Sequence, residues 1–298
     1  MIVVSIFGGL GSQMDQYSFY LGLKKHYPDT QFKFSLCNIV KPDHNGYELG
    51  RIFGIFPEEA SFSEIMALSE IVPFDARYFK FRSFLGTLRR SVFGYKDSWI
   101  IPDDPSAFYK EVFELNPLKN YLFFGNWSNE KYRQNVNDEI YEAFKFPKIE
   151  DTKNLDVLRK IESSNSVSIH VRRGDYIKYG YPMLSLNYYK KAVEIIREKN
   201  KEAKFFVFSN DVPYVKDNFD FLNDYEVVDV NSGCSSYKDM QLMSHCKHNI
   251  IANSTFSYWG ARLNRNPNAV VVCPKYHVPQ CKHTASMPNW VILDNHVF

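Results

Sequence analysis

The 298-residue sequence lacks the features that mark several common classes of protein. Its formal net charge is only +2, so no nucleic-acid partner is expected and any anion must be bound by a local group of basic residues. It contains no apolar run of about 20 residues, the length that spans a bilayer. The apolar opening MIVVSIF has no basic segment before it, unlike a signal peptide. We therefore expect a cytoplasmic protein, with the inner face of the membrane as an alternative location.

Cysteine is scarce, and its spacing indicates neither a disulfide framework nor a metal site. The five cysteines are odd in number and none belongs to a C-x-x-C pair, which predicts thiols. Cys273, His277, Cys281 and His283 lie close together in the sequence, but their spacing matches no familiar zinc site. We expect an ordinary loop with a buried cysteine there, and neither a metal nor a cofactor in the protein.

Strands and helices alternate regularly in the second half of the chain. The sequence predicts strands at 166–171, 204–209, 225–230, 248–253 and 269–274. Helices are predicted at 186–200, 236–246 and 255–264, with Asn187 as a candidate cap of the first. Because helices of 10–15 residues separate the strands, the pattern is typical of βαβ units in a parallel sheet.

The first half of the chain has a less regular pattern. A strand at residues 1–6, a glycine-rich turn and a helix open it, and 62–71 is predicted to be helical. The stretch 121–133 is predicted to be a buried strand that turns into a helix near Asn129. A polar, proline-containing stretch begins at residue 147. We place a domain boundary there, which gives domains at 1–147 and 148–298.

The segment HVRRGDY places two arginines at the end of a predicted strand. Side chains alternate along a strand, so His170 and Arg172 point to the same face. Ligands bind parallel sheets at the carboxyl ends of strands, and a guanidinium group matches a phosphate with two hydrogen bonds. Asp175 could orient an arginine or bind a ribose or a base. The alternative is a surface ion pair between Arg173 and Asp175.

Two further strands also end in polar residues. After the strand at 248–253, Asn253, Ser254, Thr255 and Phe256 open a helix, whose unpaired N–H groups attract anions. Simple N-capping by Ser254 is the alternative, and it is compatible with phosphate binding.

The strand at 204–209 ends in Asn210 and Asp211, and a carboxylate there could accept hydrogen bonds from guanine. An ordinary turn before a helix is equally compatible with that pattern. In the first half, Gly8, Gly9 and Gly11 follow a strand and would let a ligand approach the backbone closely. A tight turn is the alternative, because the loop lacks the full dinucleotide fingerprint.

Together these segments resemble the α-1,2-fucosyltransferases of glycosyltransferase family 11. GGLGSQMDQY, HVRRGDY, FSND and ANSTFSYW occur here in the order of the family's GGLGNQMFQY, H-x-RRGDY, FSDD-like and SNSSFSWW segments. NGYELGRIF and GNWSNEKYR also resemble family segments, so the likeness spans nearly the whole chain.

The resemblance implies a GT-B-like α/β fold, with two Rossmann-type domains facing across a cleft. It implies an inverting enzyme that moves L-fucose from GDP-fucose, held by the C-terminal domain, to the 2-hydroxyl of a galactoside acceptor glycan at the N-terminal domain. The donor-binding residues it implies are Gly8, Gly9, Gly11, His170, Arg172, Arg173, Asp175, Asn210, Asp211, Asn253, Ser254, Thr255 and Phe256. Arg172 would contact the diphosphate. Another deoxysugar or linkage, or a binding module without catalysis, are alternatives.

The chain has no Asp-x-Asp triplet, and carboxylates usually hold the divalent cation of a metal-clamped nucleotide sugar. We therefore expect arginines to neutralise the diphosphate instead. Two departures from the family pattern, Ser12 for Asn and Asp15 for Phe, leave the catalytic base open. Asp15, His44 and Glu48 are candidates.

The basic and aromatic run from Arg77 to Lys96 could lie on an anionic membrane that presents a lipid-linked acceptor. A solvated helix face is the favoured alternative for this run.

Overall fold

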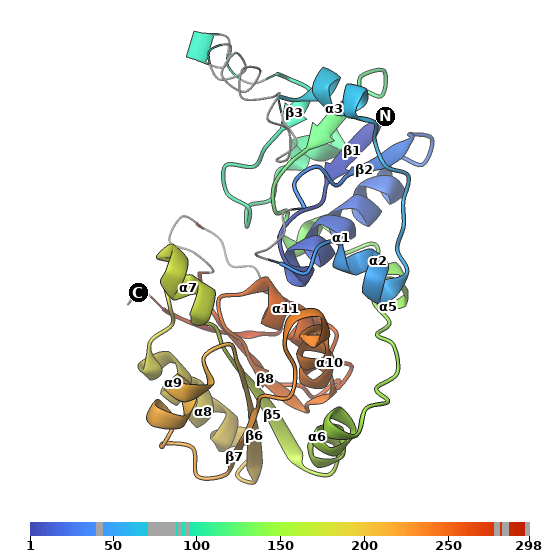
Figure 1. Ribbon diagram of the computed structural model, residues 1–298. Coiled ribbons are helices and arrows are strands. Elements are labelled where there is room, and N and C mark those ends of the chain that lie inside the picture. The colour runs from blue at the N-terminus through green and yellow to red at the C-terminus, as the bar shows by residue number, and fades with distance from the viewer. Residues whose placement is uncertain are drawn as a thin grey trace. The chain divides into compact units, whose positions relative to one another are not determined.

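A computed structural model of the chain describes residues 1–39, 44–70, 88, 91–92, 94, 96–276, 281 and 286–295. The chain divides into two compact units, Met1–Lys145 and Phe146–Phe298 (Figure 1). This division lies close to residue 147, where the sequence predicts a boundary. Each unit has a parallel sheet of its own. Within the described residues, no helix is long and apolar enough to cross a bilayer.

The described part of the N-terminal unit contains a four-stranded parallel sheet. Its strands are β1 (Ile2–Ser5), β2 (Phe32–Ser35), β3 (Trp99–Ile100) and β4 (Tyr121–Phe123). They lie in the order β2–β1–β4–β3. The helices are α1 (Leu10–His26), α2 (Glu48–Phe53), α3 (Phe62–Leu68) and α5 (Asn137–Ala143), with 3₁₀ turns η2 (Lys110–Phe113) and η3 (Glu130–Tyr132).

Strand β1 presents buried apolar side chains to both faces of this sheet. Ile2 and Val4 pack on one face with Phe19 of α1. Val3 points to the other face and packs with Ile65 of α3. All five side chains are buried, so β1 is the centre of the unit's core. The glycine-rich loop that follows β1 is thereby fixed at the carboxyl edge of the sheet.

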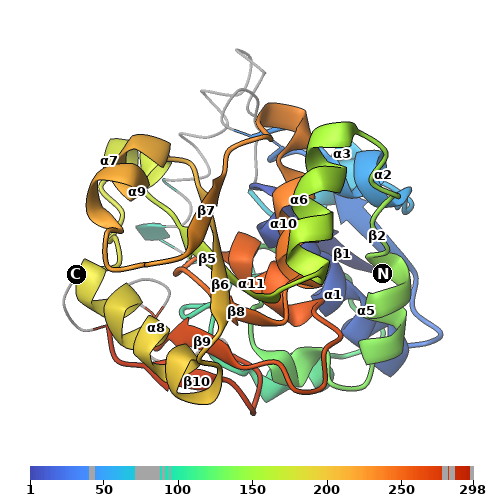
Figure 2. The ribbon, with the colours of Figure 1, turned by 90° about the horizontal axis from the view of Figure 1, so that it is seen from below.

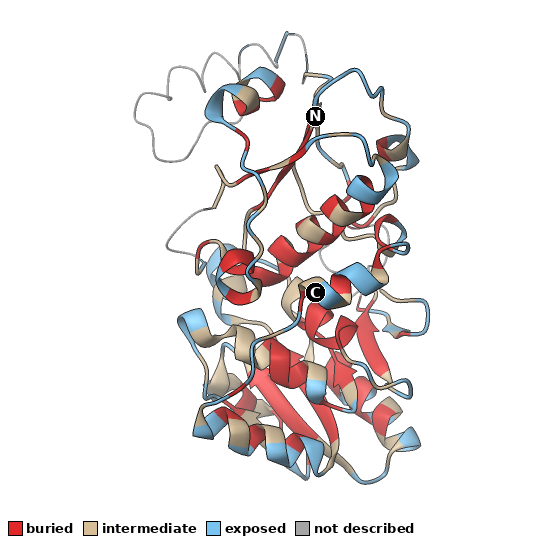
Figure 3. Ribbon diagram, turned by 90° about the vertical axis from the view of Figure 1, so that its right-hand side faces the viewer, coloured by how far each residue is buried: buried red, intermediate tan, exposed pale blue. Residues whose placement is uncertain are grey.

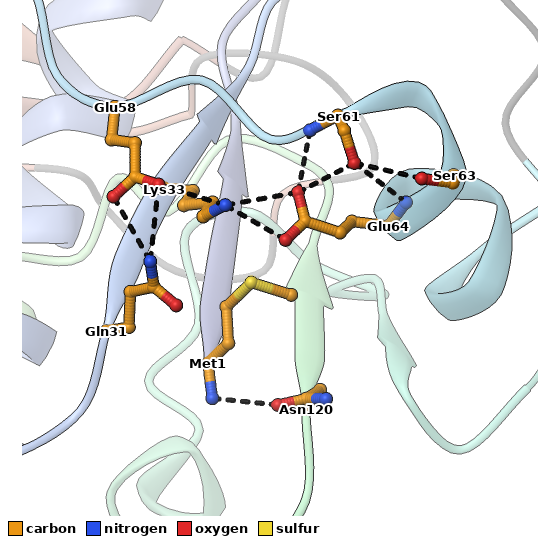
Figure 4. Close-up of polar contacts among 8 residues, drawn as sticks. All are labelled: Met1, Gln31, Lys33, Glu58, Ser61, Ser63, Glu64 and Asn120. Carbon is orange, nitrogen blue, oxygen red and sulfur yellow. Dashed lines mark hydrogen bonds and ion pairs between the residues drawn. The ribbon is translucent and has the colours of Figure 1, made fainter.

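A polar cluster covers the edge strand β2 (Figure 4). Lys33 donates to Glu64 at 2.9 Å and forms an ion pair with Glu58 at 3.0 Å. Ser61 and Glu64 form a capping box at the start of α3. Lys33 and the Ser61 donors lower the pKa of Glu64 to about 2. Phe34 N–H also donates to the carbonyl of Glu58 at 2.8 Å, and Ala60 N–H donates to the carbonyl of Phe34 at 2.7 Å, so the cluster holds residues 58–64 against this edge.

The described part of the C-terminal unit contains a six-stranded parallel sheet. Its strands are β5 (Asn165–Val171), β6 (Ala203–Ser209), β7 (Tyr225–Val228), β8 (His248–Ile250), β9 (Val271–Pro274) and β10 (Val291–Leu293). They lie in the order β10–β9–β8–β5–β6–β7. The helices are α6 (Thr152–Glu162), α7 (Gly174–Tyr179), α8 (Leu186–Lys199), α9 (Val212–Asn218), α10 (Tyr237–His245) and α11 (Thr255–Arg262), with a 3₁₀ turn η4 (Gly233–Ser235).

Strand β6 shows why the central strands read as continuous apolar runs. Phe205 and Val207 pack on one face with residues of α8 and α9. Phe206 and Phe208 pack on the other face with residues of α6 and α10. Figure 2 shows these helix pairs on opposite sides of the sheet, and Figure 3 shows its central strands as buried. Burying each of these side chains contributes roughly 1.5–3 kcal/mol to the free energy of unfolding. The sheet is therefore a rigid base for the loops at its edge.

The sequence prediction needs correction at several element ends. The strand predicted at 248–253 ends at Ile250, and the strand predicted at 225–230 ends at Val228. Asn187 is not the cap of α8, because the helix begins one residue earlier. Ser185 is the N-cap, and its side chain accepts from the backbone N–H of Tyr188.

Candidate active site

The polar segments of the C-terminal unit meet at one edge of its sheet. Strands β8, β5 and β6 are neighbours and parallel, so their carboxyl ends lie on the same side. Arg172 and Arg173 follow β5, and Asn210 follows β6. Ser254 lies in the turn between β8 and α11. The sheet therefore brings three sequence-predicted segments together where parallel α/β sheets bind ligands.

Arg172 is held from two sides and keeps one donor unused. Its Nη2 donates to Asp175 Oδ2 at 2.6 Å, and its Cζ lies 5.7 Å from the ring centroid of Tyr176. Its Nε is buried and has no hydrogen-bond partner among the described residues. A buried guanidinium donor without an acceptor is costly, so an anion that accepts from this edge would complete the arrangement.

Arg173 has different partners from those considered in the sequence. Its Nε donates to Asp211 Oδ2 at 3.1 Å, and its Cζ lies 3.5 Å from the ring centroid of Tyr214 in α9. The ion pair of Arg173 with Asp175, given above as the alternative, is therefore wrong. Asp175, in the first turn of α7, pairs instead with Arg172, which precedes the helix and lies three positions earlier in the chain. Two acidic residues thus orient two adjacent arginines.

Asn210 and Asp211 organise this edge of the sheet. Asn210 Oδ1 accepts from the backbone N–H groups of Arg173 (2.9 Å) and Gly174 (3.1 Å), and its Nδ2 donates to Asp175 (3.1 Å). Asp211 Oδ1 caps α9 by accepting from the N–H of Tyr214. Both carboxylate oxygens of Asp211 already accept hydrogen bonds within the protein. The geometry therefore favours an ordinary turn before α9 over a hydrogen bond from guanine to this carboxylate.

The side chain of His170 is uncharged and forms one side of the site. It is 4% exposed, and burial together with the nearby charge of Arg172 lowers its pKa to about 3. Its ring centroid lies 5.7 Å from that of Phe256 in α11. Its Nδ1 is buried and has no partner among the described residues. An uncharged imidazole beside Arg172 can therefore contact a ligand without adding charge.

The start of α11 is tied to α7 through Tyr176, a residue that sequence reasoning missed. Its hydroxyl donates to the backbone carbonyl of Asn253 at 2.7 Å, and burial raises its pKa to about 12. Ser254 is the N-cap of α11, and its Oγ accepts from Phe256 N at 3.3 Å. Thr255 begins the helix. The capping reading is confirmed, and the first N–H groups of α11 lie beside the arginine loop.

The glycine-rich loop of the N-terminal unit is fixed by a second missed residue, Gln13. Its Nε2 donates to the carbonyls of Gly8 (2.9 Å) and Gly46 (2.8 Å), and its Oε1 accepts from the N–H of Glu48 (2.9 Å). Gly8 has φ +75°, as a tight turn requires. A Cβ on Gly9 would lie 3.3 Å from the Nδ1 of His44. Backbone and imidazole are thus in close contact in this loop.

Gly11 is buried in the first turn of α1. It lies inside the helix, so it offers a ligand less backbone than Gly8 or Gly9 does.

The three candidate bases have very different surroundings. Asp15 is 1% exposed and accepts from Arg133 Nη1 at 2.9 Å and from Ser128 Oγ at 2.7 Å. Glu48 is also buried and accepts from the N–H of Leu10, at the start of α1. His44 is exposed to solvent beside Gly9. The geometry favours structural functions for the two carboxylates, and it leaves His44 as the accessible candidate.

The described residues contain no group of three or more His, Cys, Asp and Glu side chains that could hold a metal ion. Of the cluster weighed as a zinc site, Cys273 is buried, and burial raises the pKa of its thiol to about 12. His277 and His283 lie outside the described residues, as does most of the run from Arg77 to Lys96. Lys96 itself donates to the carbonyls of Met66 and Ala67 at the end of α3.

The segments that meet at this edge also match known proteins. A model of glycosyl transferase family 11 matches residues 103–294. The chain belongs to glycosyl transferase family 11. This glycosyltransferase is 30% identical over 309 residues to the O-antigen biosynthesis glycosyltransferase WbnK of Escherichia coli, covering 96% of the chain and 98% of that relative. It is 28% identical over 286 residues to an α-1,2-colitosyltransferase of the same species, covering 92% and 91%.

A solved structure supports the fold. The NodZ α-1,6-fucosyltransferase co-crystallised with GDP superposes with a TM-score of 0.51, covering 87% of this chain and 91% of its own. The two chains are only 15% identical, so the likeness concerns the fold alone. Two Rossmann-like units, each with a parallel sheet flanked by helices, agree with the GT-B class expected from the sequence.

Proposed function

We propose that this family 11 glycosyltransferase moves L-fucose from GDP-fucose to the 2-hydroxyl of a galactoside in an acceptor glycan. The transfer inverts the anomeric carbon and needs no metal. The C-terminal unit binds the donor and the N-terminal unit binds the acceptor. The observation that carries the proposal is the pair of oriented guanidinium groups at the end of β5, one with a buried donor left over.

The proposed reaction is a single displacement. The acceptor oxygen bonds to the anomeric carbon as the bond from that carbon to the β-phosphate oxygen breaks, and GDP leaves with both electrons. Negative charge therefore grows on the β-phosphate oxygen, where donors that are already in place stabilise the transition state most. Arg172 and Arg173 supply such donors. Ser254, Thr255 and the first turn of α11 would hold the phosphates, with His170 and Phe256 as walls.

We propose that His44 accepts the proton of the attacking hydroxyl group, because it is the exposed candidate beside the glycine-rich loop. Replacing His44 by Ala should lower kcat and remove the acidic limb of the pH–rate profile, while KM for the donor changes little. The matched control is His245→Ala, an exposed histidine at the end of α10. An unchanged acidic limb in the His44 variant would reject the assignment.

Another deoxysugar is the main alternative, because one relative is named a colitosyltransferase. Colitose is L-fucose without its 3-hydroxyl, so the two donors differ by one polar group. A site that hydrogen-bonds a hydroxyl can reject the analogue that lacks it by a factor of about 10⁴–10⁵. A non-catalytic binding module is the second alternative, and turnover of any donor would dismiss it.

The deciding experiment is a donor panel with a galactose-terminated acceptor, read by NMR for linkage and anomeric configuration. GDP-fucose, GDP-colitose and GDP-mannose are compared at equal concentration. The proposal expects turnover of GDP-fucose with an α-1,2 linkage as the product. Faster turnover of GDP-colitose would show that GDP-colitose, and not GDP-fucose, is the preferred donor. Binding without turnover of any donor would overturn the proposal.

A further inference from the structure

Helix α7 and the residue after its end present aromatic rings to solvent beside the two arginines. The ring centroids of Tyr176 and Tyr181 are 5.4 Å apart, and those of Tyr181 and Tyr179 are 6.3 Å apart. Tyr179 is 47% exposed and Tyr181 is 51% exposed. Single exposed apolar side chains are ordinary, whereas adjoining ones mark candidate ligand sites. We call the rings of Tyr179 and Tyr181 the α7 surface, and the donor chemistry given above does not use it.

The way in which α7 ends explains why Tyr181 lies against Tyr176. Gly180 has φ +68°, the left-handed conformation that ends many helices, and its N–H donates to the carbonyl of Ile177 at 3.4 Å. The N–H of Tyr181 donates to the carbonyl of Tyr176 at 2.9 Å. These two bonds form a Schellman motif, in which the residue after the glycine packs on the last turn. The motif accounts for the contact between Tyr181 and Tyr176, but not for the exposed ring of Tyr179.

Hydrogen bonds to Asn253 hold the α7 surface in place. The hydroxyl of Tyr176 donates to the carbonyl of Asn253 at 2.7 Å, and Nδ2 of Asn253 donates to the carbonyl of Pro182 at 2.9 Å. The chain is thus tied to the turn before α11 on both sides of Tyr179 and Tyr181. Because these rings are already ordered, a ligand can contact them with little loss of conformational entropy.

Arg172 connects the α7 surface with the proposed diphosphate site. Its Cζ lies 5.7 Å from the ring centroid of Tyr176, and its Nη2 donates to Asp175 in the first turn of α7. Arg173 instead lies over the ring of Tyr214 in α9. The α7 surface begins one ring contact beyond Tyr176. A hexose joined to a phosphate at Arg172 is therefore close enough to reach it.

The chemistry of the two rings favours one part of a sugar. A phenol ring is apolar over its faces and polar only at its hydroxyl group. The hydroxyl group of Tyr179 accepts from Lys178 Nζ at 2.9 Å. In L-fucose, the 6-methyl group extends a face of the pyranose ring that carries C–H groups. Such a face gains from contact with an aromatic ring, whereas a 6-hydroxyl group would lose its water there.

We propose that the α7 surface contacts the 6-methyl group and the adjoining C–H face of the transferred sugar, and so selects 6-deoxy donors over donors with a 6-hydroxyl group. The proposal rests on the proposed function, because it names the part of the donor that this enzyme recognises. Colitose carries the same methyl group, so the proposal holds for either donor. Tyr179 and Tyr181 determine specificity and take no part in making or breaking bonds.

GDP-L-galactose is the matched probe, because L-galactose is L-fucose with a hydroxyl group on C6. kcat/KM is measured for GDP-fucose and GDP-L-galactose with the wild type, Tyr179→Ala and Tyr181→Ala. We expect the wild type to prefer GDP-fucose at least about tenfold. Each variant should lower this preference at least about fourfold, the effect of losing one methyl contact. No preference in the wild type, or an unchanged preference in Tyr179→Ala, would overturn the proposal.

Ile177→Ala and Tyr179→Phe are the matched variants. Ile177 is a 53% exposed apolar residue of the same helix. Two helical positions separate it from Tyr179, which places the two side chains about 160° apart around the axis, so its loss should not change the preference. Tyr179→Phe keeps the ring and should keep the preference. Loss of the preference in Tyr179→Phe would assign the effect to the hydroxyl group and overturn the proposal.

Binding of GDP shows whether the variants are folded. In isothermal titration calorimetry with the full chain, we expect Tyr179→Ala to bind GDP with a Kd within about twofold of the wild type and to bind GDP-fucose at least about fourfold more weakly. The ring of Tyr181 packs on the last turn of α7, so Tyr181→Ala carries the greater risk of misfolding. Tyr179→Ala alone decides the test if Tyr181→Ala does not bind GDP.

The same measurements separate this proposal from the proposed function. Transfer from GDP-fucose, with a donor preference that Tyr179→Ala does not change, rejects the α7 surface and keeps the proposed function. A higher KM for the galactoside in that variant, with an unchanged donor preference, would show that the surface binds the acceptor and would also overturn the proposal. A loss of selective GDP-fucose binding in Tyr179→Ala, without transfer by the wild type, keeps the α7 surface and rejects the proposed function.

Discussion

At the residue scale, burial decides which side chains of the C-terminal edge carry charge. His170 is neutral at ordinary pH because it is buried beside Arg172, which lowers its pKa to about 3. A diphosphate bound at this edge, as proposed, would therefore meet positive charge from Arg172 and Arg173 and none from His170. The sequence predicts all three residues from one motif. It does not predict their partners, because Tyr176 and Tyr214 reach the arginines only after α7 and α9 have folded against the sheet edge.

Asp239, in the first turn of α10, is a further residue that no motif indicated. Burial raises the pKa of its carboxyl to about 7, and the hydrogen bond from Asn231 at 2.7 Å opposes this only in part. The native state therefore keeps this proton up to about pH 7, whereas an unfolded chain loses it near 3.9. In that interval the native state binds more protons, so stability decreases as the pH rises.

We predict that Asp239→Asn reduces this loss of stability, because an amide does not ionise. The free energy of unfolding of the variant, measured by urea denaturation, should decrease less between about pH 4 and pH 8 than that of the wild type. Asp156→Asn, on the exposed face of α6, is the matched control. Parallel stability curves for Asp239→Asn and the wild type would contradict the prediction.

At the scale of elements, the loop after β4 depends on α1 through the ion pair of Asp15 and Arg133. Both side chains are buried, and removing one partner of such a pair typically costs about 3–5 kcal/mol. Asp15→Phe would introduce the residue of the family pattern and remove the carboxylate at 2.9 Å from Arg133, which would keep the weaker ion pair of its Nε with Glu130 at 3.5 Å.

We predict that Asp15→Phe lowers the free energy of unfolding by about 3–5 kcal/mol, and that Arg133→Met in the same chain restores much of it. A double-mutant cycle by urea denaturation measures the coupling. A single-variant loss below about 1 kcal/mol, as for an exposed pair, would show that the pair does not stabilise this loop.

The elements predicted well from the sequence are those that are long enough for the periodicity of their apolar residues to be recognised. Strand β6 is apolar over most of its length because helices cover both of its faces. Strands β3 and β10 have two and three residues and carry no periodicity, so the sequence missed them. Helix α7 was missed because none of its six residues is buried.

At the scale of the whole molecule, two parallel-sheet units and the match to glycosyl transferase family 11 agree with the alternation of strands and helices and with the order of the motifs. The sequence predicted which loops meet at the edge of the C-terminal sheet, because each one directly follows a strand. It did not identify Gln13, which fixes the glycine-rich loop beside His44, because packing brings these residues together from segments far apart in the chain.

The central claim is that guanidinium groups neutralise the departing diphosphate. The direct measurement is steady-state transfer from GDP-fucose by chelator-treated enzyme, comparing wild type, Arg172→Ala, Arg172→Lys and, as the control, Arg159→Ala, an exposed arginine of α6. We predict that the chelator-treated wild type is active and that Arg159→Ala has the same activity. Arg172→Ala should lower kcat by a factor of about 10²–10³, and Arg172→Lys should have an intermediate kcat. More than about a tenth of wild-type activity in Arg172→Ala, or a wild type that is inactive until manganese is restored, would contradict the claim.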